Sequence, residues 1–158
     1  MVPRTALALL LGLGLAGCAG AFAPTPYADA VEAARLDTAT LRLVGRGNAM
    51  TPDARLHDYV LLRAAEETRA AGFGHFRVLE QRDTGTTDTT TSAGTYTTER
   101  HHHHDVTTYV PGDTTTTRLP GLTAVVRMYP GPKPADAGGN VYDAAEVAAF
   151  VGPRARDA

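Results

Sequence analysis

The chain has 158 residues, a formal charge of −2 and a single cysteine. This length suffices for one domain with a modest hydrophobic core. One cysteine excludes an intramolecular disulfide and every metal motif built from several cysteines. Cations and anions are scattered along the sequence without a basic stripe, so we expect no nucleic-acid partner.

The N-terminus has the pattern of a bacterial export signal. Arg4 precedes an apolar run from Thr5 to Leu15, which is too short to span a bilayer because a spanning helix needs about 20 residues. We therefore interpret residues 1–17 as a signal peptide.

Residues 15–18, Leu-Ala-Gly-Cys, resemble the lipobox of bacterial lipoproteins. The resemblance implies diacylglyceryl transfer to Cys18, cleavage before it and acylation of the new amino terminus. Two or more acyl chains give a durable membrane anchor. Ala19 resembles the residue found in lipoproteins sorted to the outer membrane, so the expected location is the periplasmic face of that membrane. Residues 18–38 are then the lipidated N-terminus and a tether. The alternative is an ordinary secretory signal with an incidental cysteine.

Two segments after the tether alternate between apolar and polar residues and predict strands. In residues 40–46, Leu41 and Leu43 share one face. Residues 75–83 alternate in the same way, with Leu79 ambiguous. A helix between them, joined by short connections, predicts a right-handed crossover with two parallel strands.

The intervening helix is the clearest element of the sequence. Thr51 is a plausible N-cap, Pro52 suits the first helical position, and Gly72 stands where a glycine would end the helix. Helical periodicity puts one apolar stripe inside, and Tyr59 falls at its boundary.

The composition changes abruptly over residues 84–117, where threonine dominates. Threonine favours strands, and the Val-Pro-Gly-Asp sequence at 110–113 suits a turn. Alternatively, residues 83–94 have no apolar face and are consistent with a mobile loop. We expect a loop over about 83–94 followed by a long hairpin with a polar tip, and a break at Pro120-Gly121.

The C-terminal part predicts one more strand and a short helix. Residues 122–129 alternate, and Asp143 with Glu146 forms a capping box. Val147, Phe150 and Val151 are the candidates to face the sheet. Residues 153–158 are expected to be a frayed tail.

Together these elements predict an α+β fold with about four strands in a mixed sheet (βαβ, then a β-hairpin). One long helix lies on a face of the sheet and a short helix ends the chain. The single domain spans 39–152, with the Thr/His-rich stretch 84–117 as an insertion.

Residues 40–80 resemble a family of small bacterial envelope lipoproteins of unknown function. The resemblance is carried by Gly-Arg-Gly-Asn at 45–48, Leu-Leu-Arg-Ala-Ala-Glu-Glu-Thr at 61–68 and Gly-Phe-Gly-His-Phe-Arg-Val at 72–78. The matching positions are Asn48, Arg63, Glu66, Gly72 and Phe76. The family implies no catalytic role for them, and an Arg63–Glu66 ion pair is the structural expectation.

Catalytic residues are scarce. Ser92 is the only serine and lies in the threonine-rich stretch, and Glu66 and Glu67 are adjacent helical positions whose side chains diverge. We therefore expect no enzyme.

The tract His101–His104 is the one metal-capable cluster. If residues 96–110 are extended, His101, His103 and Asp105 share one face at a spacing that suits Zn²⁺ or Cu²⁺. The alternatives are a polar hairpin that binds metals opportunistically and a pH switch.

The sequence therefore predicts a non-enzymatic lipoprotein that is held to the membrane by its N-terminal lipid and contacts an unknown envelope protein. A transition-metal-binding envelope protein is the second hypothesis, and an enzyme of unknown type is the third.

Overall fold

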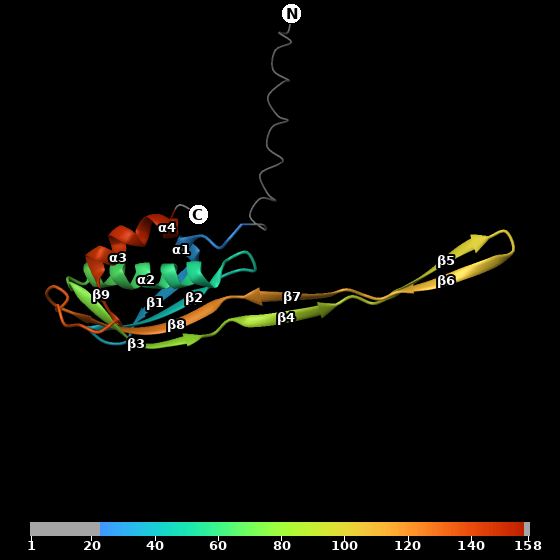
Figure 1. Cartoon of the computed structure of the whole chain (residues 1–158). Helices are drawn as coiled ribbons and strands as arrows, with labels where there is room; N and C mark the ends of the chain where they lie inside the picture. The colour runs from blue at the N-terminus through green and yellow to red at the C-terminus, as the bar shows by residue number, and fades with distance from the viewer. Residues whose placement is uncertain (1–22, 157–158) are drawn as a thin grey trace, which may run out of the picture.

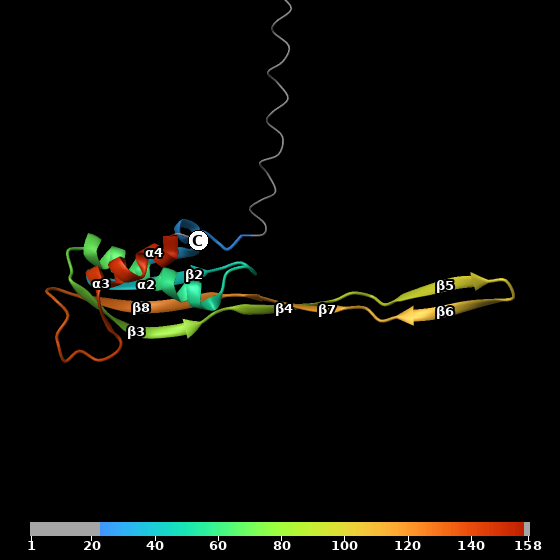
Figure 2. The ribbon, with the colours of Figure 1, turned by 45° about the horizontal axis from the view of Figure 1, so that its top comes forward.

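A five-stranded antiparallel sheet carries every described helix on one of its faces (Figures 1 and 2). The computed structural model describes residues 23–156, apart from the side chain of His101. The strand order is β1-β2-β8-β3-β9. The bounds of the body are α1 Tyr27–Ala30, β1 Val31–Arg35, β2 Thr40–Arg46, α2 Asp53–Ala70, β3 His75–Asp83, β8 Gly121–Tyr129, β9 Val141–Asp143, α3 Ala144–Phe150 and α4 Gly152–Arg156.

Two further pairs of strands leave the body as a long ribbon (Figure 1). The inner pair is β4 Thr86–Thr91 with β7 Thr114–Leu119, and the outer pair is β5 Thr95–His101 with β6 His104–Val110. The predicted loop over about 83–94 is wrong because β4 occupies much of it. Cross-strand threonine pairs stabilise such a ladder without an apolar face.

The α+β fold with one long helix and a short C-terminal helix is confirmed, and the strand pairing corrects the expected crossover. β2 and β3 both run antiparallel to β8, so they point in the same direction, as a crossover requires. However, β8 lies between them, and every pairing in the sheet is antiparallel rather than mixed. The strand β8, which is distant in sequence, lies between β2 and β3. Local periodicity does not reveal such an insertion.

The helix α2 ends as predicted and begins differently. Gly72 has φ of 80°, and the N–H of Phe73 donates to the Thr68 carbonyl, which satisfies the last turn. At the other end Pro52 occupies the N-cap position without a side-chain cap. The Thr51 hydroxyl instead accepts from the N–H of Thr25 at 2.9 Å.

The core lies between α2 and the sheet. Leu41 and Leu43 of β2 are fully buried, as their alternation predicts, and Gly45 lets the helix approach because a Cβ there would lie 2.8 Å from Val60 Cγ2. Tyr59, expected at the boundary, is only 1% exposed and donates from its hydroxyl to the Thr25 carbonyl. Thr25 and Tyr27 cover this side of α2, which is why Tyr59 is buried rather than at the boundary.

The described parts of the expected tether and tail, residues 23–38 and 153–156, both belong to the fold. Within the expected tether 18–38, α1 packs on α2 and β1 forms the edge of the sheet. Within the expected tail 153–158, residues up to Arg156 form α4, where Ala155 is buried. The C-terminal helices pack on α2 rather than on the sheet, so Phe150 is 74% exposed while Val147 and Val151 are buried.

Candidate functional site

The ribbon is the continuation of one long hairpin that begins in the body. Its register does not change from Glu80 opposite Val125, through Thr86 opposite Leu119, to His101 opposite His104. Pro120 separates β7 from β8 without shifting the register, in agreement with the predicted break. The hairpin therefore projects from the same two strands, β3 and β8, that lie at the centre of the body.

The threonine side chains of the ribbon form hydroxyl pairs across its strands. Thr91 and Thr114 bring their Oγ1 atoms to 3.1 Å, and Thr98 and Thr107 theirs to 2.9 Å. Between these two pairs, the rings of Tyr96 and Tyr109 lie 5.0 Å apart between centroids and remain mostly exposed. An isolated two-stranded hairpin is only marginally stable in water. The ribbon therefore depends on these cross-strand contacts for its stability.

The outer edges of the ribbon are unpaired within residues 23–156, since β4–β7 and β5–β6 are two-stranded sheets. The N–H of Thr84 donates to Gly121 and that of Ser92 donates to Asp113. By the alternation of antiparallel ladders, the odd-numbered residues of β4 then direct their N–H and C=O groups outward. Such an edge is a template for a further strand.

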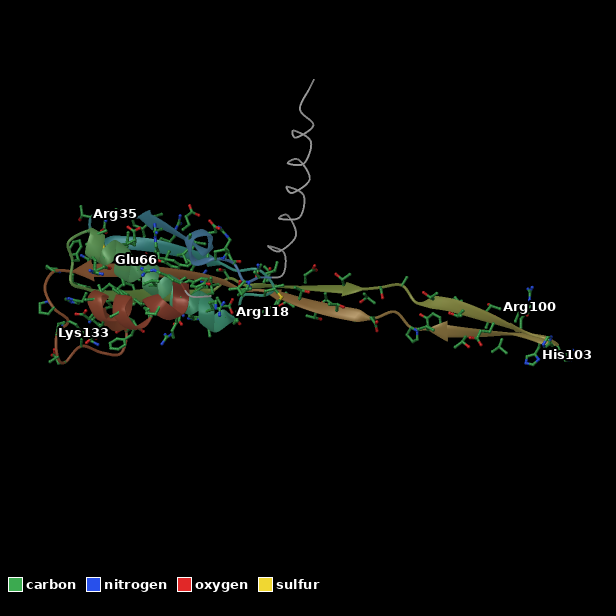
Figure 3. The ribbon with its side chains drawn as sticks, turned by 90° about the horizontal axis from the view of Figure 1, so that it is seen from above. Arg35, Glu66, Arg100, His103, Arg118 and Lys133 are labelled. Carbon is green, nitrogen blue, oxygen red and sulfur yellow. The ribbon has the colours of Figure 1, made fainter. Side chains whose placement is uncertain are left out.

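The turn at the ribbon tip consists of His102 and His103, and Figure 3 shows His103 at the far end. The expected turn at 110–113 is wrong, because Val110 is the last residue of β6 and residues 111–113 connect that strand to β7. Asp105 lies opposite Arg100 and forms an ion pair with it at 3.3 Å.

The shared face expected for His101, His103 and Asp105 is therefore wrong. That grouping assumed an extended segment over 96–110, whereas the chain reverses within it. Among the described residues, which leave out the His101 side chain, no three His, Cys, Asp or Glu side chains are grouped to hold a metal ion. Binding of Zn²⁺ or Cu²⁺ by the tract stays a prediction.

Arg118 holds the ribbon base against the body, as Figure 3 shows near the start of α2. Its guanidinium donates to Asp83 at 2.6 Å and to Asp53 at 3.1 Å. The Gly85 N–H and Arg118 lower the pKa of the Asp83 carboxyl, and the two aspartates raise the pKa of Arg118. These three residues, Arg118, Asp83 and Asp53, which we call the clamp, connect β7, the end of β3 and the first turn of α2.

A small cavity of about 110 Å³ lies between α2 and the sheet, lined largely by apolar residues such as Leu61 and Val78. Gln81 and His57 also belong to its lining, and Gln81 Nε2 lies 3.3 Å from His57 Nδ1. Sites for drug-sized ligands usually measure about 300–1,000 Å³. Ser92 is not among the residues that line this cavity; its hydroxyl donates to the Asp113 carbonyl and accepts from the Asp113 N–H.

The residues that carry the family resemblance mostly hold the body together. Asn48 donates from its amide to the carbonyl of Ala23 at 2.7 Å. Glu66 accepts from the Tyr27 hydroxyl at 2.5 Å and from Arg156. Burial and this carboxylate raise the pKa of Tyr27.

Arg63 departs from the expected pairing, since it forms an ion pair with Glu67 at 2.9 Å rather than with Glu66. Glu66 instead accepts hydrogen bonds from Tyr27 of α1 and Arg156 of α4. Gly72 ends the helix and Phe76 is fully buried, so both have structural roles.

No family model, no curated protein and no solved structure matches this chain. The resemblance to envelope lipoproteins therefore stays a prediction. The predicted signal peptide 1–17 and the lipidation site Cys18 lie outside the described residues. Within residues 23–156, no helix has both the length and the apolar character needed to cross a membrane.

Sequence reasoning missed a surface that the tertiary structure creates. Arginines that are scattered along the sequence gather on the sheet face opposite the helices. Alternation within each strand was the available signal, because Arg42 and Arg46 alternate with the buried Leu41, Leu43 and Gly45. Only the strand order shows that these positions meet arginines from other strands.

Proposed function

We propose that this chain is a lipid-anchored outer-membrane lipoprotein that acts as a non-enzymatic interaction module of the cell envelope, with the ribbon as its contact to a partner protein. The observation that carries the proposal is the exposed hairpin from β4 to β7, whose outer edges are unpaired among the described residues. The lipobox resemblance at residues 15–18 supports the anchor.

The expected partner is an envelope protein that offers an edge strand of its own. Strand addition supplies main-chain hydrogen bonds, while side chains of the added strand give specificity. The ribbon is nearly free of aliphatic side chains in its inner half, because β4 has the sequence Thr-Thr-Asp-Thr-Thr-Thr. A threonine-rich edge is suited to backbone pairing, and the exposed tyrosines Tyr96 and Tyr109 provide aromatic contacts.

The membrane anchor is tested by labelling with palmitate. The wild-type chain is expected to incorporate the label and to fractionate with outer membranes, whereas Cys18→Ala loses both. Equal labelling of Cys18→Ala would show that the anchor assignment is wrong.

The ribbon contact is tested with photo-crosslinking residues placed one at a time in intact envelopes. We expect crosslinks to one defined partner from Thr89 on β4 and none from Ala70 on the exposed end of α2. Crosslinks that form from α2 and not from the ribbon would contradict the proposal.

Strand addition in particular is tested by a matched pair of variants at Thr89. Thr89→Pro removes an outward N–H, which an edge strand tolerates, and Thr89→Ala keeps it. Both variants lose the hydroxyl that lies 3.4 Å from Thr116 Oγ1. The crosslink from a neighbouring ribbon position should be lost in Thr89→Pro and retained in Thr89→Ala; loss in both would point to side-chain recognition instead.

A further inference from the structure

The sheet face opposite the helices, which we call the open face, collects five exposed arginines from three strands. On β2 these residues alternate with Leu41 and Leu43, which face α2. The register places Arg127 opposite both Thr40 and Arg77, and Arg82 opposite Thr123. The five residues are Arg42, Arg46, Arg77, Arg82 and Arg127.

The acidic side chains of this face do not balance its arginines. Glu32 lies 3.9 Å from Arg46, and Glu80 lies 3.0 Å from Arg82. Within residues 23–156, Arg42, Arg77 and Arg127 form no ion pair, although the pKa of the Asp37 carboxyl is lowered by a backbone hydrogen bond and, to a smaller extent, by attraction to Arg127. Arg77 and Arg127 are direct cross-strand neighbours, an arrangement of like charges that destabilises a sheet by itself. The face therefore has an excess of positive charge that favours an anionic partner.

The arginines near the ribbon base surround two adjoining depressions. The larger is open, measures about 660 Å³ and is lined by Arg42, Arg46 and Thr123 among others. The smaller, of about 250 Å³, has Arg42, Arg82 and Val125 in its lining, together with Glu80, the carboxylate that pairs with Arg82. Half-buried Val44 and Val125 form an aliphatic floor between the guanidinium groups. This combination suits a phosphodiester, because arginine binds phosphate with two parallel hydrogen bonds.

The described chain begins at this end of the sheet. The Asn48 side-chain amide donates a hydrogen bond to the Ala23 carbonyl, and Asn48 follows Arg46 by two residues. Ala23 therefore lies near Arg46. Residues 18–22 are all that separates the proposed lipid site Cys18 from Ala23, and they span at most about 18 Å. An anchored chain therefore keeps the Arg46 corner close to the bilayer surface.

We propose that the open face of the sheet is a binding surface for anionic phospholipid headgroups, with Arg42, Arg46 and Arg82 as its centre. The inference rests on the proposed function for the position of the membrane, but the binding chemistry belongs to the described residues. Basic clusters next to an anchor bind anionic membranes additively, and salt screens them. The surface orients the body on the bilayer so that the ribbon can reach a partner.

The test uses a chain of residues 18–158 with Cys18→Ser, which contains every described residue and carries no lipid. Its sedimentation is measured with vesicles of phosphatidylethanolamine alone and with 30% phosphatidylglycerol, about a third of the headgroups being anionic. We expect binding to the anionic vesicles only, with a loss of about tenfold or more in 0.5 M NaCl. Because this chain has no acyl groups, a failure here is separable from a failure of palmitate labelling at Cys18.

Two triple variants with the same change of charge locate the surface. Arg42→Gln, Arg46→Gln and Arg82→Gln combined should reduce binding about tenfold or more. Arg35→Gln, Arg55→Gln and Arg69→Gln combined, at the sheet edge and on α2, should change it less than twofold. Circular dichroism of both variants verifies that they fold.

Four results would overturn the proposal. These are equal binding to both kinds of vesicle, no binding at all, equal losses in the two triple variants, and displacement by 10 mM inorganic phosphate, which would indicate a single-anion site. Binding of a short oligonucleotide at least as tightly as the anionic vesicles, lost in the same triple variant, would assign the face to nucleic acid instead.

Discussion

The guanidinium of Arg118 donates to the carboxylate of Asp83 at 2.6 Å across the point where the ribbon meets the body. The same group reaches Asp53 in the first turn of α2 at 3.1 Å. Asp53 also complements the helix dipole at that end. The base of the ribbon is therefore fixed by charge and hydrogen bonds rather than by an apolar core.

The pKa of Asp83 is expected to depend on this clamp. Its folded pKa lies below the ordinary aspartate value of about 3.9 because the Gly85 N–H and Arg118 stabilise the carboxylate. The resulting stability is present above about pH 4 and is lost as the pH falls through the folded pKa. In Arg118→Gln the pKa should rise only in part, since the Gly85 N–H remains. NMR titration of the Asp83 carboxyl carbon measures this pKa. The control variant Arg100→Gln, at the ribbon tip, should leave the pKa of Asp83 unchanged.

Leu62 is expected to be essential to the body even though it faces away from the sheet. It is fully buried where the C-terminal helices cover α2. Leu62→Ala should lower the free energy of unfolding by about 2–5 kcal/mol through lost burial and a cavity. Phe150→Ala is the control and should stay within about 0.5 kcal/mol because its side chain is 74% exposed. Urea denaturation measures both; equal effects would contradict this packing.

Asp143 is expected to stabilise the start of α3 through its side chain. Its Oδ1 accepts from the N–H groups of Ala145 at 2.8 Å and Glu146 at 3.0 Å. Asp143→Ala should cost about 0.5–2 kcal/mol, whereas Asp143→Asn retains a capping oxygen and should cost much less. If thermal denaturation finds the two variants equally unstable, the cap is not the source of the effect.

Gly45 is expected to resist enlargement because α2 passes close above it. A Cβ at this position would lie 2.8 Å from Val60 Cγ2 and 3.1 Å from Leu56 Cδ1. Gly45→Ala should therefore destabilise the fold by about 1–3 kcal/mol. The double variant with Val60→Ala should be less destabilised than the sum of the single changes, since the methyl group that clashes is gone. Strict additivity in urea denaturation would exclude a direct contact.

Local signals were reliable wherever one residue and its near neighbours decide the conformation. Gly72 ends α2 with a positive φ, and Asp143 caps α3, as the sequence predicts. The alternation of β2 and β8 identified their buried faces correctly. These features depend on steric and hydrogen-bonding constraints that act within a few residues.

The candidate surfaces were less accessible to sequence reasoning. The ribbon was partly assigned to a loop because threonine repeats carry no apolar periodicity, and only the pairing with residues 104–119 made it a ladder. The shared face expected for His101, His103 and Asp105 was wrong because the chain turns at His102 and His103, and parity along a single strand cannot give the position of a turn.

The sequence by itself determined the α+β class, the long helix with its C-terminal glycine, and the strands whose alternation marks a buried face. Tertiary structure alone decided that β8 lies between β2 and β3, that the helices α1, α3 and α4 pack on α2, and that the open face is basic. The physical reason is the range of the interactions. Capping and periodicity are short-range, whereas strand order depends on contacts between residues as distant as Arg42 and Val125.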